Sequence, residues 1–368
     1  MFGCEFFVGS DRAIEPPSRI PVTLSSLSRI RTVRIHLDGE LSSFGTTTIE
    51  DGREAGHMSL DLDRIAVDES VSAVFPPETL IECLSKTPVE VDRVDGTIES
   101  LAGQQAVITL AHREAFLELS WVHSIQAGVD RFPRDRFRSN GVVLTSSTGI
   151  HGDAVGETVA GYVLALSRRL HDHIANQQRR TWSQPQWDDA WTVAGEQACV
   201  VGLGSLGRGI VDRLTGLGLD VVGVRRTPVP EPGVDRVYPS DDFLEAITDA
   251  RFVVLAVPLT DDTRGLVDTA MLDEMRQDAY LINVARGPVV DQDALVEALQ
   301  DGLIAGAAVD VFETEPLPES SPLWDIDDVI ISPHCAAFTR DYAGHVASIV
   351  RESIDRVRAG EDPVNRVI

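Results

Sequence analysis

The feature that most constrains the fold is a glycine-rich turn between an apolar run and a helical pattern. Residues 198–201 are apolar and lead directly into Gly202, Gly204 and Gly207, after which apolar side chains recur at helical spacing. A second apolar run at 221–224 completes a strand–helix–strand unit. In such a unit the first glycine allows a tight turn, the second lets a pyrophosphate approach the backbone, and the third lets the helix pack closely. The sequence therefore predicts a dinucleotide-binding sheet.

The rest of the chain predicts an α/β protein with two sheets of this kind. A helical pattern at 153–173 is expected to bridge two domains or to pack at a dimer interface, and a last helix at 339–359 is expected to return to the first domain. We expect two Rossmann-like, doubly wound domains with a cleft between them. The expected strands are 64–67, 89–91, 106–109, 121–125 and 142–144 in the first sheet, and 198–201, 221–224, 252–256, 280–283, 306–309 and 329–332 in the second.

Domain boundaries follow from these elements. We expect a substrate domain from 58–157 and 342–368, and a dinucleotide-binding domain from 158–341. Residues 1–57 are rich in Ser, Thr, Pro and Gly and show little periodicity. We interpret them as an extension that is disordered or that reflects a mis-assigned start, with Met58 as the natural initiator. A genuine extra segment with its own role is the alternative.

The charge balance restricts the partners. Lys and Arg number 32 against 58 Asp and Glu, which gives a net charge of -26, and Lys86 is the only lysine. Such an acidic surface repels nucleic acid and anionic lipid, so we expect neither as a partner. Acidity spread along a lysine-poor chain is typical of a halophilic protein, whose charge is screened by salt. An ordinary acidic protein is the alternative.

The cysteines and the apolar runs indicate a cytoplasmic location. Cys4, Cys83, Cys199 and Cys335 lie far apart without CxxC spacing, which argues against disulfides and against a zinc site. No apolar stretch approaches the roughly 18 residues that span a membrane. The N-terminus shows no secretory signal.

The end of the second strand of the glycine-rich unit bears on the choice of dinucleotide. Enzymes that use NAD usually carry Asp or Glu there, where it accepts a hydrogen bond from the ribose 2′-OH. This strand ends in Arg225-Arg226-Thr227, and Asp220 lies at its beginning. Because two guanidinium groups would pair with a 2′-phosphate, the sequence favours NADP(H), with NAD(H) possible. Two solvated arginines beside an undiscriminating ribose pocket are the alternative.

Another segment is expected at the same site. Val257 and Pro258 directly follow the run at 252–256 and would line the adenine side. The hydroxyl groups of Thr260 and Thr263 could reach phosphates, or could cap the next helix instead.

Three expected strands end in groups suited to reduction of a 2-oxo acid. Hydride transfer to such a ketone needs a cation for the carboxylate, an acid beside the ketone oxygen, and a group that keeps this acid protonated. Arg286, Glu315 and His334 each follow a predicted strand, at the edge where ligands bind in parallel sheets. A carboxylate beside His334 would favour its imidazolium form.

The order of these residues resembles that of a known family. Gly follows Arg286, Pro follows Glu315 and Pro precedes His334, and all three motifs come after the glycine turn. In this order of motifs, residues 58–368 resemble the D-isomer-specific 2-hydroxyacid dehydrogenases. The resemblance implies that Arg286 binds the substrate, that His334 is the general acid/base, and that Glu315 hydrogen-bonds to it. It implies that Asp310 helps to hold the nicotinamide carboxamide.

The expected cofactor site extends over the whole second domain, and no metal is expected. The residues expected to bind the cofactor are Gly202, Gly204, Ser205, Leu206, Gly207, Arg225, Arg226, Thr227, Val257, Pro258, Thr263, Val284, Ala285, Asp310 and Ala336.

The first domain resembles the family at the end of its fourth expected strand. The backbone N–H groups of Ala127 and Gly128 would donate to the substrate carboxylate, and the alternative is a plain tight turn. His123 and His151 are expected to be structural or to face solvent. Many relatives have Ala where this chain has Gly156, which costs up to about 1 kcal/mol of helix propensity and leaves the chemistry untouched.

The sequence thus predicts a homodimeric oxidoreductase that transfers a hydride between NADP(H) and a small 2-oxo or D-2-hydroxy acid. A glyoxylate- or hydroxypyruvate-specific reductase is one alternative. Phosphoglycerate dehydrogenase is another, although such relatives usually carry a C-terminal regulatory domain for which residues up to Ile368 leave no room. Formate oxidation is disfavoured because Glu315 stands where those relatives have Gln. A cofactor-sensing, corepressor-like binding protein is the alternative from a different class.

Overall fold

The computed structural model describes residues 62–368. The expected extension, 1–57, and the proposed start at Met58 lie outside the described residues.

The first sheet has five parallel strands in the order β2-β1-β3-β4-β5. Side chains on both faces of its central strands are buried, so each face needs a cover. Helices α1 and α9 pack against one face. Helix α2 and a short 3₁₀ helix pack against the other. The elements are β1 (Arg64–Asp68), α1 (Pro77–Leu84), β2 (Glu90–Val94), β3 (Ala106–Thr109), the 3₁₀ helix Glu114–Glu118, β4 (Trp121–Ser124), α2 (Arg134–Ser139), β5 (Val143–Ser146) and α9 (Tyr342–Arg358).

The second sheet has seven parallel strands in the order β12-β11-β10-β9-β6-β7-β8. The six expected strands are all present, and β8 is an addition that sequence analysis missed, because three half-exposed residues leave no pattern. The chain order reverses at β6, which lies between β7 and β9. In doubly wound sheets ligands bind beside this reversal. The strands are β6 (Gln197–Val201), β7 (Asp220–Val224), β8 (Arg236–Tyr238), β9 (Phe252–Leu255), β10 (Tyr280–Asn283), β11 (Gly306–Val309) and β12 (Val329–Ile331).

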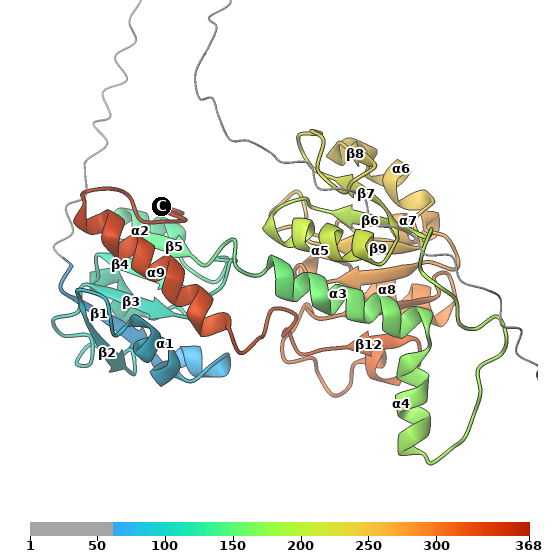
Figure 1. The fold of residues 1–368 in the computed structure, drawn as a ribbon, viewed down its shortest axis with the longest axis horizontal. Coiled ribbons are helices and arrows are strands. Elements are labelled where there is room, and N and C mark those ends of the chain that lie inside the picture. Colours follow the sequence, from blue (N-terminus) through green and yellow to red (C-terminus); the bar gives the residue numbers. More distant parts are fainter. Residues whose placement is uncertain (1–61) are drawn as a thin grey trace, which may run out of the picture. The chain divides into compact units, whose positions relative to one another are not determined.

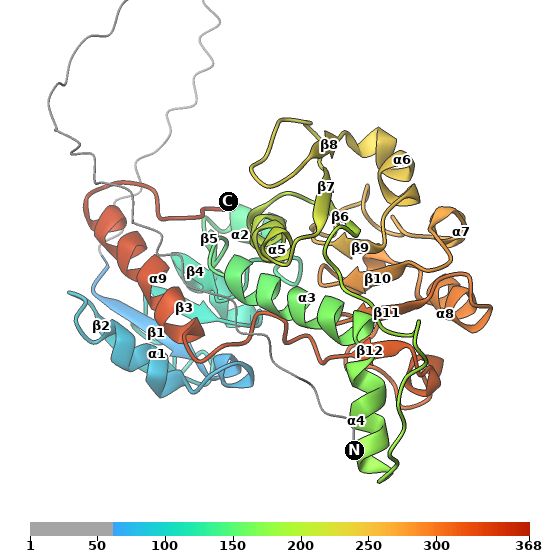
Figure 2. The same ribbon diagram turned by 45° about the vertical axis from the view of Figure 1, so that its right-hand side comes forward.

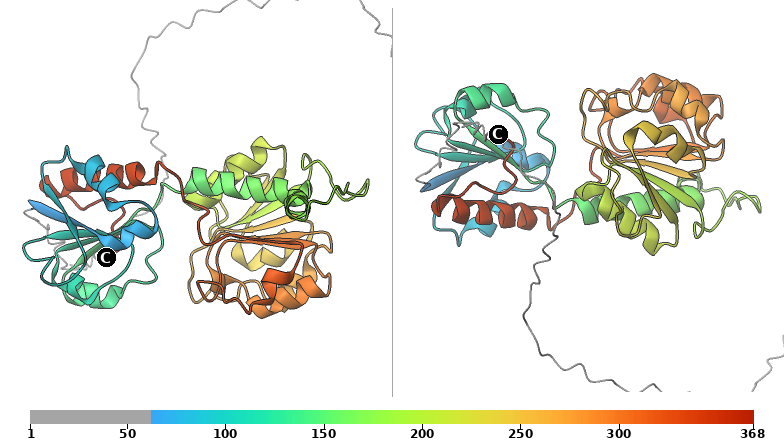
Figure 3. Two further views of the ribbon diagram at one scale, coloured as in Figure 1. Left: turned by 90° about the horizontal axis from the view of Figure 1, so that it is seen from below. Right: turned by 90° about the horizontal axis from the view of Figure 1, so that it is seen from above.

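Helices cover both faces of the second sheet, as Figure 3 shows. One face packs against α3 (Gly152–Ser167) and α5 (Ser205–Gly216). The other packs against α6 (Phe243–Thr248), α7 (Thr269–Glu274) and α8 (Gln292–Gln300). The expected fold class, α/β with two doubly wound sheets, is confirmed.

Two glycines let α3 and α5 lie side by side in close contact (Figure 2). A Cβ atom on Gly156 would lie 2.3 Å from the carbonyl oxygen of Gly209, and one on Gly209 would lie 2.0 Å from that of Gly152. Real Cβ atoms do not approach oxygen so closely, and the helix axes would have to separate. The glycine at position 156 therefore has a packing role that helix propensity alone does not indicate.

The expected single helix at 153–173 is interrupted after Ser167, so its residues belong to two helices. Arg169 adopts a left-handed conformation with φ of 54°, which ends α3 and starts α4 (Leu170–Gln178) in a new direction. Its side chain forms ion pairs with Asp172 at 2.6 Å and with Asp328 at 2.5 Å. These contacts offset the cost of a positive φ at a residue with a side chain.

Helix α9 returns to the first sheet, as expected, and lies beside α1 (Figure 1). Tyr342, Val346, Val350 and Ile354 recur at helical spacing and are all buried in the first core.

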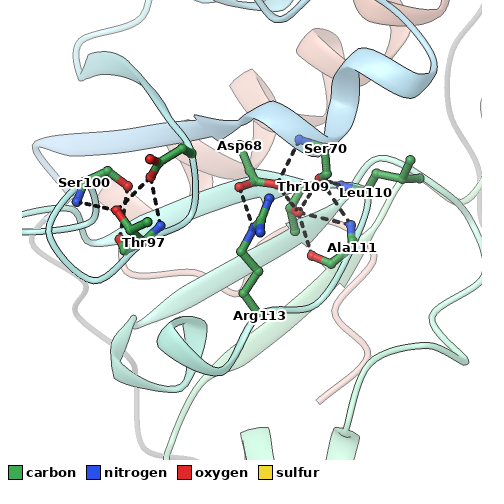
Figure 4. A network of polar contacts seen from close by, with 9 residues as sticks. Asp68, Ser70, Thr97, Ser100, Thr109, Leu110, Ala111 and Arg113 are labelled. Atoms are coloured by element: carbon green, nitrogen blue, oxygen red, sulfur yellow. Dashed lines mark hydrogen bonds and ion pairs between the residues drawn. The ribbon is translucent and has the colours of Figure 1, made fainter.

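A polar network ties the carboxyl ends of β1 and β3 together (Figure 4). The buried carboxylate of Asp68 accepts hydrogen bonds from the backbone N–H of Ser70, from the hydroxyl of Thr109 and from Nε of Arg113. A buried charge needs such partners. Gly96 fits against the same group, where a Cβ would lie 2.1 Å from Nε of Arg113.

Across residues 62–368, we find no helix with both the length and the apolar character needed to cross a membrane.

Candidate active site

The glycine turn between β6 and α5 has the geometry expected of a phosphate-binding loop. Gly202 has φ of 99°, and a Cβ there would lie 2.7 Å from the carbonyl oxygen of Ala256. A Cβ on Gly207 would lie 1.9 Å from the carbonyl oxygen of Gly202. Gly204 has open space where its Cβ would stand and directly precedes α5, whose N-terminal N–H groups lack intrahelical partners. An anion such as a pyrophosphate fits this opening.

Arg225, at the end of β7, forms an ion pair with a carboxylate that sequence analysis missed. Glu231, with an exposed side-chain fraction of only 11%, accepts from Nη1 of Arg225 at 3.1 Å and from Nε of Arg208 at 2.9 Å. Arg226 is exposed and forms no ion pair with any residue from 62 to 368. Together the three guanidinium groups and one carboxylate carry a net positive charge. Thr227, next along the chain, is exposed.

The segment after β9 lies beside the glycine turn. Val257 is in contact with Gly202, since a Cβ on this glycine would lie 2.8 Å from its side chain. The hydroxyl of Thr263 donates to the carbonyl of Pro258 at 2.6 Å and accepts from the N–H of Thr260. The capping alternative is wrong, because the next helix, α7, is capped by Asp268.

Arg286 is positioned by the residues that end β10. The amide of Asn283 donates to the carbonyl of Arg286, and its oxygen accepts from the N–H of Ala285, which fixes the turn. Gly287 then lies against the backbone after β11, where a Cβ would be 1.9 Å from the carbonyl carbon of Phe312. Only glycine allows this approach, which draws the turn carrying Arg286 toward the segment that leads to Glu315.

The guanidinium of Arg286 lies against the loop after β4. A Cβ on Gly128 would be 1.7 Å from Nη2 of Arg286. Nε of the arginine lies 3.4 Å from Oδ2 of Asp130, and Nη1 donates to the carbonyl of Ala285 at 2.7 Å. The expected substrate residues from the two sheets, Gly128 and Arg286, are therefore in contact. Asp130 is an addition that the sequence analysis did not single out.

His334 and Glu315 form a hydrogen-bonded pair. Nδ1 of His334 lies 2.8 Å from Oε2 of Glu315, whose other oxygen accepts from the N–H of Phe312 at 3.2 Å. Burial opposes ionisation of Glu315, but the hydrogen bond and charge of His334, the Phe312 N–H and the charge of Arg131 hold the pKa of this carboxyl below its usual range. An ionised carboxylate orients the ring through this hydrogen bond.

Asp310 holds the turn that presents His334. The histidine has φ of 52°, a left-handed conformation that is uncommon for a residue with a side chain. The buried carboxylate of Asp310 accepts from the hydroxyl of Ser332 at 2.6 Å and from the N–H groups of Cys335 and Ala336 at 2.9 and 3.0 Å. Its backbone carbonyl accepts from the N–H of His334 at 2.8 Å. Three side-chain hydrogen bonds thus support the strained turn.

Helix α3 also forms hydrogen bonds with the turn that presents His334. The hydroxyl of Tyr162 lies 2.6 Å from that of Ser332, and Thr158 donates to the carbonyl of Ala336 at 2.9 Å. Because Ser332 donates to Asp310, its oxygen must accept from Tyr162. Burial raises the pKa of Tyr162 to about 12, so this phenol remains a donor.

One cavity collects many of the expected residues from both sheets. Arg286 and His334 line it together with Gly128. The arginine pair at the end of β7 does not contribute to its walls. Its complete lining is Gln126, Ala127, Gly128, His151, Val155, Leu206, Val284, Arg286, Asp310, His334, Ala336, Ala337, Phe338 and Tyr342.

The two histidines expected to be structural or solvent-facing are both buried. His123 lies between the hydroxyl groups of Thr145 and Ser147 at 2.8 and 3.0 Å, and burial lowers its pKa to about 3. His151 is 5% exposed and lines the cavity.

No group of three or more His, Cys, Asp or Glu residues between 62 and 368 is arranged to hold a metal ion.

Comparison with known proteins gives a consistent result. The model of the D-isomer specific 2-hydroxyacid dehydrogenase NAD binding domain matches residues 160–336. A glyoxylate reductase of Thermofilum pendens is 34% identical over 263 residues, which cover 68% of this chain and 75% of the relative. A glyoxylate reductase of Korarchaeum cryptofilum is 28% identical over 341 residues, which cover 91% of this chain and 95% of the relative. The crystal structure of a D-isomer specific 2-hydroxyacid dehydrogenase from Xanthobacter autotrophicus, in complex with NADPH and MES, is 31% identical with a TM-score of 0.71, over 83% of this chain and 98% of that one.

Proposed function

The chain belongs to the family of D-isomer specific 2-hydroxyacid dehydrogenases, and we propose that it uses NADP(H) to reduce a small 2-oxo acid to its D-2-hydroxy acid. The observation that carries the proposal is the meeting of Arg286, Gly128 and His334 in one cavity, with Glu315 bonded to the histidine. The first sheet with α9 is the proposed substrate domain, and the second sheet is the proposed dinucleotide domain.

Arg286 binds the substrate carboxylate and polarises the ketone. Its guanidinium can donate two parallel hydrogen bonds, and the backbone N–H groups of Ala127 and Gly128 lie on the same loop beside it. Asp130 holds Nε of the arginine and so limits its rotation. A carboxylate fixed in this way places the adjacent carbonyl beside His334.

His334 delivers the proton to the carbonyl oxygen. Its Nδ1 is held by Glu315, so Nε2 is the atom that faces the substrate. Glu315 stabilises the imidazolium form before transfer, and the left-handed turn fixed by Asp310 sets the direction of the ring. In the reverse reaction the same nitrogen takes the proton from the hydroxyl group.

The second sheet suits a nicotinamide dinucleotide. The open space at Gly204 fits the pyrophosphate, and Val284, Asp310 and Ala336 would hold the nicotinamide end. Ser205, Leu206, Gly207, Val257, Pro258, Thr263 and Ala285 complete the proposed contacts. When bound, the cofactor supplies the hydride. Arg225 and Arg226, with a net positive charge around Glu231, favour a 2′-phosphate and hence NADP(H).

Oxidation of NADPH with a panel of 2-oxo acids tests the proposal. We expect turnover with at least one of glyoxylate, hydroxypyruvate, pyruvate and longer 2-oxo acids, measured at 340 nm in buffers of low and high salt. His334→Asn should reduce kcat by roughly 100-fold or more. Saturable binding of NADPH without turnover of any acid would instead favour a cofactor-sensing protein.

We further propose a homodimer formed through α4 and the segment that follows it. Large apolar side chains are exposed here, including Ile174 at 58%, Trp182 at 94% and Trp187 at 92%. Exposed apolar groups gathered on one segment are typical of a protein interface. Light scattering after size-exclusion chromatography should give twice the mass of one chain, and Trp182→Glu with Ile174→Glu should give that of a monomer.

A further inference from the structure

His151 occupies a position in the cavity that the proposed mechanism leaves without a role. It immediately precedes α3 and is almost entirely buried. Arg286, Gly128 and His334 line the same cavity. Its Nδ1 atom is inaccessible to solvent and has no hydrogen-bond partner among residues 62–368. Leaving such a nitrogen unpaired costs about 1–3 kcal/mol, so a partner on a bound ligand would relieve a real penalty.

Tyr342 determines which ring nitrogen of His151 carries the proton. Its hydroxyl lies 2.7 Å from Nε2 of His151 and 2.9 Å from the carbonyl oxygen of Ile125. A carbonyl only accepts, so the single phenolic hydrogen points to Ile125. The bond to the histidine then requires that Nε2–H donates to the tyrosine oxygen. In the neutral ring Nδ1 is therefore a bare acceptor.

Burial keeps this ring neutral. It lowers the pKa of His151 to about 4, and the charges of His345 and Arg286 act in the same direction. The ring packs edge-on against Tyr342, with centroids 5.0 Å apart, which fixes its plane. At neutral pH the cavity wall therefore includes an uncharged ring of fixed orientation, whose Nδ1 is an acceptor without a partner among residues 62–368.

We infer that His151 determines substrate specificity by accepting, at Nδ1, a hydrogen bond from a hydroxyl group on the carbon next to the ketone. The inference rests on the proposed function and names its substrate class: 2-oxo acids with a 3-hydroxyl group. Through Tyr342 the histidine is bonded to Ile125, which begins the loop that carries Gly128 and the proposed carboxylate site. This link joins His151 to the loop of the proposed carboxylate site. The amide of the nicotinamide carboxamide is the other possible donor, and the experiment separates the two.

Two substitutions of His151 separate its two nitrogens. The amide of glutamine reaches the position of Nε2 and can keep the hydrogen bond to Tyr342, but glutamine has no polar atom at the position of Nδ1. The shorter asparagine places its amide at the position of Nδ1 and loses the hydrogen bond to Tyr342. His123→Gln, at a histidine buried outside the cavity lining, is the matched control.

The measurement is kcat/KM for hydroxypyruvate and for pyruvate at saturating NADPH, with the Kd of NADPH for each variant. We expect the native chain to prefer hydroxypyruvate by roughly tenfold, the upper range for a neutral hydrogen bond. His151→Gln should abolish this preference by lowering kcat/KM for hydroxypyruvate roughly tenfold more than kcat/KM for pyruvate, with the Kd of NADPH changed by less than about threefold. His151→Asn and His123→Gln should retain it.

An unchanged preference in His151→Gln overturns the inference and leaves the proposed function standing. Equal losses for both acids, with weaker NADPH binding, would also overturn it and would assign Nδ1 to the carboxamide. Absence of turnover with every acid in the native chain would overturn the proposed function and this inference with it.

Discussion

Gly128 lies so close to Arg286 that a Cβ atom on the glycine would be 1.7 Å from Nη2 of the arginine. We predict that Gly128→Ala displaces this guanidinium and lowers kcat/KM for the 2-oxo acid by roughly 100-fold, the typical effect of misplacing a binding group by about 1 Å. The fold should persist, since the end of a flexible side chain can move. Steady-state kinetics and thermal unfolding measure the two effects.

The control for this substitution is Gly216→Ala, at a helical glycine with open space around it. It should leave the kinetics unchanged and raise Tm slightly, because alanine has the higher helix propensity. If Gly128→Ala reduced Tm strongly and kcat/KM only slightly, the contact would serve folding and not substrate binding.

Glu315→Gln should lower kcat for reduction by roughly 10- to 100-fold near neutral pH. The depressed pKa of the native carboxyl keeps it ionised through the neutral range, so it holds Nδ1 of His334 by a charge-assisted hydrogen bond that a neutral amide does not reproduce. Because this carboxyl is protonated only as the pH falls through its pKa, the difference in kcat between the two proteins should narrow in acid. Profiles of kcat against pH for both proteins check this. A ratio independent of pH would mean that Glu315 only orients the ring.

Glu231→Gln should tighten NADPH binding roughly fivefold, equivalent to about 1 kcal/mol, because a 2′-phosphate would no longer share Arg208 and Arg225 with a carboxylate. Arg226→Gln should weaken it by a similar factor. Neither change should alter NADH binding more than about twofold. Fluorescence titration with both nucleotides measures these constants. Loss of NADH affinity in Glu231→Gln would show instead that the carboxylate accepts from a 2′-OH.

His123 should make the fold sensitive to acid. Burial lowers its pKa from 6.5 to about 3, so between these values the unfolded chain binds a proton that the folded chain does not. The contribution of the neutral, buried His123 ring to the free energy of unfolding is complete above pH 6.5. It is lost as the pH falls below this value, by about 1.4 kcal/mol per pH unit. Urea unfolding at several pH values should show this slope, reduced in His123→Gln. An equal slope in both proteins would contradict the prediction.

The fold class and the strand ends were accessible from sequence because they depend on local patterns. A glycine turn after an apolar run and a charged residue after a buried strand lie within a few positions of each other, as around Gly202 and Arg286. Parallel strands then bring their carboxyl ends to one edge of a sheet, which is why residues as distant as Arg286 and His334 could be expected together.

Other features depend on contacts that no local pattern reports. Glu231 reaches Arg225 and Arg208 from the loop that follows β7, and no local pattern marks it as their partner. Gly156 shows only its poor helix propensity in the sequence, whereas its role comes from the backbone of Gly209. Tyr342 and His151 lie 191 positions apart and are joined by one hydrogen bond.

The return of α9 has a consequence for synthesis. Seven apolar residues of this helix, from Tyr342 to Val357, fill the core beneath the sheet whose strands leave the ribosome first. That half of the enzyme cannot finish folding until the last residues emerge, while the half encoded later already has all its own strands. Until α9 is made, the nascent protein therefore exposes the apolar surface that this helix covers, and aggregation competes with folding.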